Sequence, residues 1–60
     1  MHKTLYDFVL EGNSDQAYAI ICEDHVEDIP LMCLATDYEN GKIDDLIFCL
    51  EIVQELEKTM

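Results

Sequence analysis

The sequence has very little positive charge, with three lysines and no arginine in 60 residues against fourteen acidic residues. The net charge is therefore −11. Proteins bind nucleic acid by placing Lys and Arg against phosphates, so this balance excludes ordinary nucleic-acid binding. It argues equally against an anionic membrane surface. The expected partner is a basic surface on another protein, above all a nucleic-acid-binding protein, because opposite charge favours and speeds association.

Motifs for catalysis are also missing. The chain has no glycine-rich phosphate loop and no nucleophile elbow, and it contains only two histidines. Few residues are left to serve as general acids, bases or electrophiles, apart from carboxylates expected on solvated faces. A pocket that encloses a substrate also needs more chain than 60 residues supply. We expect a protein that is not an enzyme and uses no cofactor.

The chain lacks both a long apolar run and an even number of cysteines. No apolar stretch reaches the roughly 18 residues of a membrane span, and no segment resembles a signal peptide. Cys22, Cys33 and Cys49 cannot all pair within one chain, and each follows apolar residues. Free core thiols in a reducing compartment are the simplest interpretation. We therefore expect a cytoplasmic protein.

Half of the residues are hydrophobic, which favours a folded chain despite the charge. Turn signals divide the chain into four segments in which apolar residues recur at helical spacing. The predicted helices are residues 4–11, 14–24, 31–39 and 44–58. The run 18–22 could also be a buried strand. The sequence predicts an all-α fold, in which residues 1–60 form one compact bundle of three to four short helices with the C-terminal helix central.

Signals for the ends of the helices are clear. Thr4 precedes the first helix and is followed three residues later by Asp7. Asn13 precedes the second helix and is followed three residues later by a glutamine. Both patterns are typical of capping boxes. Gly12 is a natural helix stop. Pro30 is tolerated in the first turn of the third helix. These signals predict short turns between well-defined helices.

The last helix has more apolar surface than one stripe. Asp44 can cap its start, and Lys58 lies in its last turn, where a cation is favoured. The stripe expected to face the core is Leu46, Cys49, Leu50, Val53 and Leu56. Phe48 and Ile52, spaced i and i+4, fall outside it. They are expected to bind a partner or a second copy, unless the bundle wraps three helices around this one.

One turn has the spacing of a calcium loop. Gly41 and Asp44 stand where such a loop has its glycine and its ninth position, so the stretch partly resembles an EF-hand. Thr36 and Tyr38 occupy the first and third ligand positions, and Ile47 replaces the bidentate glutamate. Calcium binding needs those acids. A plain helix–turn–helix is therefore expected.

A second pattern is typical of zinc ligands. Cys22 and His25 form a Cys-x-x-His pair, which Cys33 and Cys49 could complete to four ligands. A second pair with knuckle spacing is missing, and both later cysteines lie in apolar runs. Buried thiols and a surface histidine are therefore expected, with no metal at all.

The acidic residues are distributed unevenly. Residues 1–22 carry three acids and one lysine, a net of −2, whereas residues 23–60 carry eleven acids and two lysines, a net of −9. The later acids are expected to bind the basic partner, where they would stand in for nucleic-acid phosphates. They are Glu23, Asp24, Glu27, Asp28, Asp37, Glu39, Asp44, Asp45, Glu51 and Glu55.

In size and charge the chain resembles the small acidic inhibitors that phages and mobile elements encode. That resemblance implies inhibition of a host protein by occupation of a basic site. The alternative is a homodimeric helical module, or a small structural subunit of a larger complex, whose apolar residues form the interface. In that case the acids only keep the surface solvated. Salt separates the two hypotheses, because it screens charge but leaves apolar packing in place.

Overall fold

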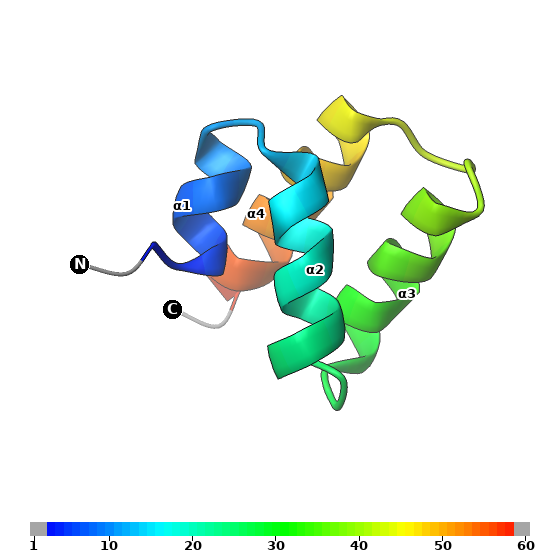
Figure 1. Ribbon diagram of the computed structural model, residues 1–60, viewed down its shortest axis with the longest axis horizontal. Helices are drawn as coiled ribbons and strands as arrows, with labels where there is room; N and C mark the ends of the chain where they lie inside the picture. Colours follow the sequence, from blue (N-terminus) through cyan, green and yellow to red (C-terminus); the bar gives the residue numbers. More distant parts are fainter. Residues whose placement is uncertain (1–2, 59–60) are drawn as a thin grey trace.

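The computed structural model describes residues 3–58, which form four helices joined by short turns (Figure 1). The helices are α1 (Leu5–Leu10), α2 (Ser14–Asp24), α3 (Ile29–Glu39) and α4 (Asp45–Lys58). Within these residues there is no strand, so the all-α prediction is confirmed and the strand alternative at 18–22 is wrong. Each predicted helix is present, with ends that differ by at most two residues. None of the four is both long and apolar enough to span a membrane.

The residue directly before each helix caps its N-terminus with a side chain. Thr4 and Asp7 form the predicted capping box at the start of α1. Asn13, Asp28 and Asp44 each accept a hydrogen bond from the backbone N–H three residues on, at 3.4, 3.3 and 2.9 Å. Such a cap contributes about 1 kcal/mol, because it satisfies an N–H group that has no partner within the helix. Local sequence thus sets where the helices start.

The turns after α1 and α3 depend on glycine. Gly12 and Gly41 have φ angles of +78° and +76°, in the left-handed region that glycine enters without steric cost. The turn between α2 and α3 (residues 25–28) contains no glycine. It leads into Pro30, which lies at the start of α3, where its missing N–H is not needed. The helix stop predicted at Gly12 is therefore confirmed.

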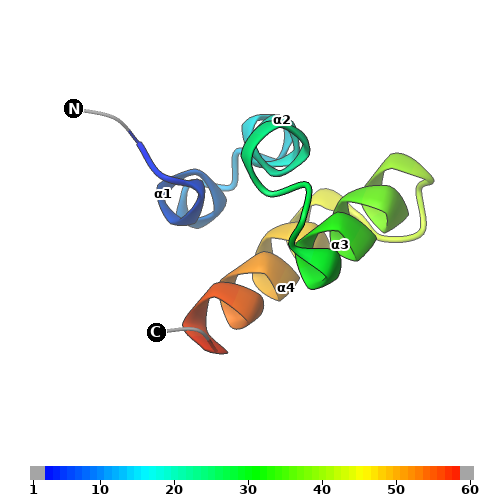
Figure 2. The same ribbon diagram turned by 90° about the horizontal axis from the view of Figure 1, so that it is seen from below.

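The central helix is α4. It contacts α1, α2 and α3, and α2 contacts both of the other two. In Figure 1, α1, α2 and α3 follow one another from left to right with α4 behind them, and Figure 2 shows α4 beneath α1 and α2 and beside α3. Three neighbours therefore pack against α4, as in the alternative with three helices around this one, but they leave the side with Leu46 and Leu50 exposed.

The core lies where α4 meets the other helices. Its buried apolar side chains are Leu5, Val9, Ala17, Ile21, Leu31, Ala35, Phe48, Cys49 and Ile52. The Phe48 ring stacks on Tyr38 of α3, with ring centroids 4.3 Å apart and an interplanar angle of 13°. This contact turns the Phe48 side of α4 towards α3 and the interior.

The buried face of α4 differs from the predicted face. The prediction that Leu46 and Leu50 are buried is wrong, because they are 68% and 52% exposed. The prediction that Phe48 and Ile52 lie exposed for a partner is also wrong, because both are 0% exposed. The intact fold therefore does not present Phe48 and Ile52 as a binding surface.

The physical reason is a rotation of α4 about its axis. At about 100° per residue, the buried side is turned by roughly 90° from the predicted stripe. Cys49 belongs to both faces and is buried, whereas Val53 and Leu56 lie at the edge and are half-buried. Apolar residues occur on most sides of α4, so periodicity alone does not define its inner face. The packing of α3 against Phe48 decides it.

Substitutions should reveal this rotation. Ile52→Val should lower the free energy of unfolding by about 0.5–1.5 kcal/mol, because it removes a buried methylene group. Phe48→Ala should cost about 3–5 kcal/mol, about the whole stability of so small a core, and should abolish the helical signal. Leu46→Ala should change the stability by less than about 0.5 kcal/mol. Circular dichroism without denaturant detects the loss of helix in Phe48→Ala, and urea denaturation measures the other two variants. A larger loss for Leu46→Ala than for Ile52→Val would mean that α4 has the rotation predicted from sequence.

Candidate interaction site

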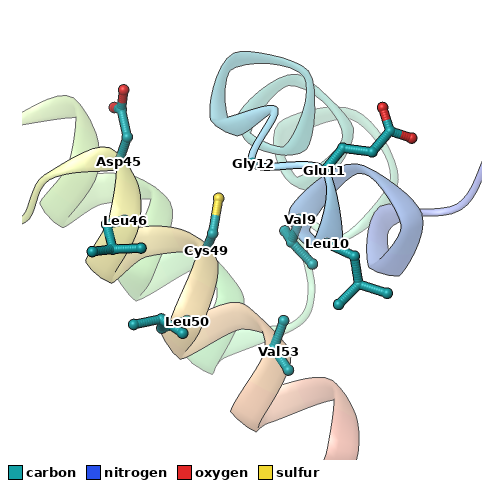
Figure 3. A pocket seen from close by; sticks show the side chains of 9 residues that line it. All are labelled: Val9, Leu10, Glu11, Gly12, Asp45, Leu46, Cys49, Leu50 and Val53. Carbon is teal, nitrogen blue, oxygen red and sulfur yellow. The ribbon is translucent and has the colours of Figure 1, made fainter.

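An apolar groove of about 550 Å³ runs between α1 and α4 (Figure 3). Val9 and Cys49 lie at its base and are buried. Its walls carry Leu10 from α1 and Leu46 and Leu50 from α4, which are 61%, 68% and 52% exposed. Exposed large apolar side chains that gather on one feature of a small protein mark a candidate interaction site. Sequence reasoning assigned Leu46 and Leu50 to the core and missed the groove.

The groove follows from the unequal lengths of its two helices. Helix α1 has six residues, whereas α4 has fourteen. Gly12, which also lines the groove, turns the chain away directly after α1. The short helix buries Leu5 and Val9 in the core but leaves the neighbouring flank of α4 uncovered. The rotation of α4 places Leu46 and Leu50 on that flank.

Two carboxylates lie at one end of the groove. Figure 3 shows Glu11 of the α1 side and Asp45 of α4 at the same end, with Val53 towards the other. Lys3 Nζ forms an ion pair with Glu11 Oε2 at 2.7 Å. No lysine among residues 3–58 forms a salt bridge with Asp45. That end of the groove is therefore negative, chiefly through Asp45.

Neither of the two metal sites considered from sequence is assembled. Within the described residues, no three His, Cys, Asp or Glu side chains come together as the ligands of a metal would. The Cys22, His25, Cys33 and Cys49 set therefore does not form a zinc site in this fold. The turn at 36–47 is a helix–turn–helix connection in which Asp44 caps α4.

The ten predicted acids do not form one continuous surface. Those at 23–28 lie at the end of α2 and in the turn before α3, whereas those at 37–45 lie around the other end of α3. At 1.5 Å per residue, the length of α3 separates the two groups by about 16 Å. Glu51 and Glu55 lie further along α4. Of the ten side chains, Asp37 and Glu55 are half-buried and the others are exposed.

Four of these ten acids cap a helix or pair with another side chain. Asp28 and Asp44 cap helices, Glu39 accepts a tyrosine hydroxyl, and Glu55 pairs with Lys58. Asp45 lies at the groove beside the Tyr38 hydroxyl. The side chains of the other five form no hydrogen bond or ion pair with any residue in 3–58; they are Glu23, Asp24, Glu27, Asp37 and Glu51. These free carboxylates are available to an outside partner.

A tyrosine cluster that sequence reasoning missed joins α2 to α3. The Tyr38 hydroxyl donates to Asp15 at 3.2 Å, so its single proton is used and the Ser14 hydroxyl, 3.0 Å away, is the donor to Tyr38. The Tyr18 hydroxyl donates to Glu39 at 2.9 Å. These partners are more than twenty residues apart in the chain, so no local pattern brings them together. The cluster ties α2 to α3 beside the core, because Tyr18 and Tyr38 both pack against its buried side chains.

Comparison with known protein families, curated proteins and solved structures gives no match. The function must therefore follow from the residues and their arrangement. Two features of the described residues offer binding chemistry, namely the apolar groove and the free carboxylates. Both lie on the surface, where another molecule can contact them.

The three thiols should differ in reactivity. Burial, with a smaller effect from the Asp45 carboxylate, raises the pKa of the Cys49 thiol, so less of the reactive thiolate is present near neutral pH. Cys33 is exposed and Cys22 half-buried, so the expectation that all three thiols are buried is correct only for Cys49. Brief alkylation followed by peptide mass spectrometry should show modification in the order Cys33, Cys22, Cys49. In denaturant the three should react at similar rates. Equally fast modification of Cys49 in the native protein would show that the base of the groove is open.

Alkaline pH should loosen the tyrosine cluster. The hydrogen bond to Glu39, with contributions from Cys22 and burial, raises the pKa of Tyr18 to about 12 from an ordinary value of 10.0. The protonated hydroxyl therefore contributes stability that is fully present below pH 10.0 and is lost as pH rises through about 12. Ultraviolet titration of the wild type against Tyr18→Phe isolates this group. Glu39→Gln should lower the Tyr18 pKa, and an unchanged pKa would contradict the role of Glu39.

Proposed function

We propose that this chain is a non-catalytic binding protein that occupies a basic site on another protein. The net charge of −11 and the free acids on α2, α3 and α4 support a basic partner. In its finer form, the proposal is that these acids take the places of nucleic-acid phosphates, as in an inhibitor of phage type that blocks a host nucleic-acid-binding protein. The separation of the acids into two groups suits contacts at several points along such a site.

The observation that carries the proposal is that carboxylates lie at the C-terminal ends of two helices, where the helix dipole disfavours negative charge. Glu23 and Asp24 lie in the last turn of α2, and Asp37 and Glu39 in the last turn of α3, and neither turn contains a basic residue. The C-terminal end of a helix is negative, so a carboxylate there typically costs about 0.3–1 kcal/mol at low salt. The fold would be more stable without the charges of Glu23, Asp24 and Asp37, whereas Glu39 also accepts a hydrogen bond from the Tyr18 hydroxyl. Their presence supports a role outside the fold.

A second candidate function rests on the groove. Leu10, Leu46 and Leu50 are more than half exposed, which favours a helical interaction module, either a homodimer or a small subunit of a larger complex. In that function the acids would only solvate the surface. High salt would weaken a contact made by charge but leave a contact made by leucines.

The cysteines support a cytoplasmic setting. All three are free thiols, and Cys33 is exposed. An exposed free thiol persists in a reducing compartment, whereas an oxidising one favours disulfides. The proposed partner is accordingly another protein of that compartment.

Neutralising the free acids should raise the stability of the fold and weaken binding to the partner. A variant with Glu23→Gln, Asp24→Asn and Glu27→Gln leaves Asp28 to cap α3. Its free energy of unfolding should rise by a few tenths to about 1 kcal/mol, because unfavourable charges leave the end of α2. Proteins captured from lysate by the wild type should elute as salt rises. The variant should capture less of them and release them at lower salt.

The matched control removes three charges elsewhere, with Asp7→Asn, Glu11→Gln and Asp15→Asn. This control should lose much less binding, since residues 1–22 carry a net of only −2. Circular dichroism must first show that it is folded, because Asp7 belongs to the capping box of α1. Capture that is indifferent to salt and to both variants would remove the basis for a basic partner.

A further inference from the structure

We propose that the groove between α1 and α4 binds one amphipathic helix of the basic partner. Apolar side chains of that helix enter the groove, and a Lys or Arg beside them lies against Asp45. The inference rests on the proposed function, since it names the part of the basic partner that is bound. It goes beyond that function by assigning the contact to the groove rather than to the acidic surface alone.

The length of the groove matches a short run of helix. Along α4 its lining extends from Asp45 to Val53, which is about 12 Å at 1.5 Å per residue. A helix that docks through residues i, i+3 or i+4, and i+7 presents an apolar stripe of about 10 Å. Two turns of a partner helix therefore match the length of the groove, which Leu10 lines from α1 and Leu46 and Leu50 line from α4 (Figure 3).

The composition of the groove suits a helix better than a small molecule. Small-molecule sites enclose their ligand and direct several polar groups at it. Here the wall leucines are more than half exposed, and the polar side chains, Glu11 and Asp45, lie at one end only. The leucine walls complement the apolar stripe of an amphipathic helix, and the negative end of the groove complements a cation beside that stripe.

Charge selects this occupant over a second copy of the chain. A twofold dimer through the groove would place the same patch of each copy against the other. Each copy carries a net charge of −11, and the two Asp45 ends would join the same interface. Like charges brought together in this way oppose association, whereas a basic helix gains from the same field. Lys3 already neutralises Glu11, so Asp45 is the carboxylate left for the partner's cation.

The probe for this inference is a synthetic helical peptide of about 18 residues, roughly five turns. It carries leucines at i, i+4 and i+7 and lysines elsewhere in an alanine background. One control peptide has the same composition in an order without an apolar stripe, and another has glutamate in place of lysine. Fluorescence anisotropy measures binding to the full chain at low and high salt. Sedimentation velocity measures the oligomeric state.

The protein variant replaces both exposed leucines, Leu46→Gln and Leu50→Gln. Its matched control is Ile29→Gln on α3, because Ile29 is 68% exposed, as Leu46 is, and lies outside the groove. The double variant should fold as the wild type does and bind the amphipathic peptide at least about tenfold more weakly, because two anchors of the contact are lost. Ile29→Gln should bind within about twofold of the wild type. Asp45→Asn should weaken binding and reduce its salt dependence.

Several results would overturn the inference. Equal binding of the two lysine peptides would assign recognition to charge alone, and equal loss in the Ile29 variant would place the contact elsewhere. A wild-type dimer that the Leu46/Leu50 variant dissolves would assign the groove to a second copy. A different result would refute the proposed function itself. If the leucine variant keeps salt-sensitive capture of a lysate partner, the groove is refuted but the basic partner stands; if neutralising Glu23, Asp24 and Glu27 changes nothing, the basic partner itself is refuted.

Discussion

The side of α4 that carries Phe48 lies against α3, where the Phe48 ring stacks on Tyr38 at 4.3 Å, and this contact sets the rotation of the central helix. Apolar residues occur around most of α4, and three neighbours cannot cover them all. With Phe48 and Ile52 turned inwards, Leu46 and Leu50 must point outwards beside α1. The core and the groove are therefore two results of one packing choice.

The acidic residues relate to the fold in two opposite ways. Asp28 and Asp44 stabilise it, because their carboxylates accept the free N–H groups at helix starts. Glu23 and Asp24 oppose it, because they lie at the negative end of α2. A small core has little stability to spare. The proposed basic partner would relieve this repulsion on binding and so stabilise the folded chain.

Groove and charge would contribute differently to a complex with a basic helix. The net charge of −11 would attract and orient the partner before contact, which mainly raises the association rate. Leu46 and Leu50 would bury apolar surface after contact, which mainly slows dissociation. Neither feature alone makes a specific site. The acids lie in separate groups and define no single surface. In the groove, Asp45 is the charged group by which one apolar partner would be favoured over another.

The sequence by itself determined the helices, their ends and the sign of the charge. These properties depend on neighbours within a few residues, as when Thr4 meets Asp7 or Gly12 takes a positive φ. Only the tertiary structure decided which side of α4 is buried, because Leu46 and Phe48 are both apolar and local spacing allows either to face inwards. It also decided the tyrosine cluster and the groove, which join residues more than twenty positions apart. Contacts of that kind depend on how whole helices pack, and packing leaves no local signal in the chain.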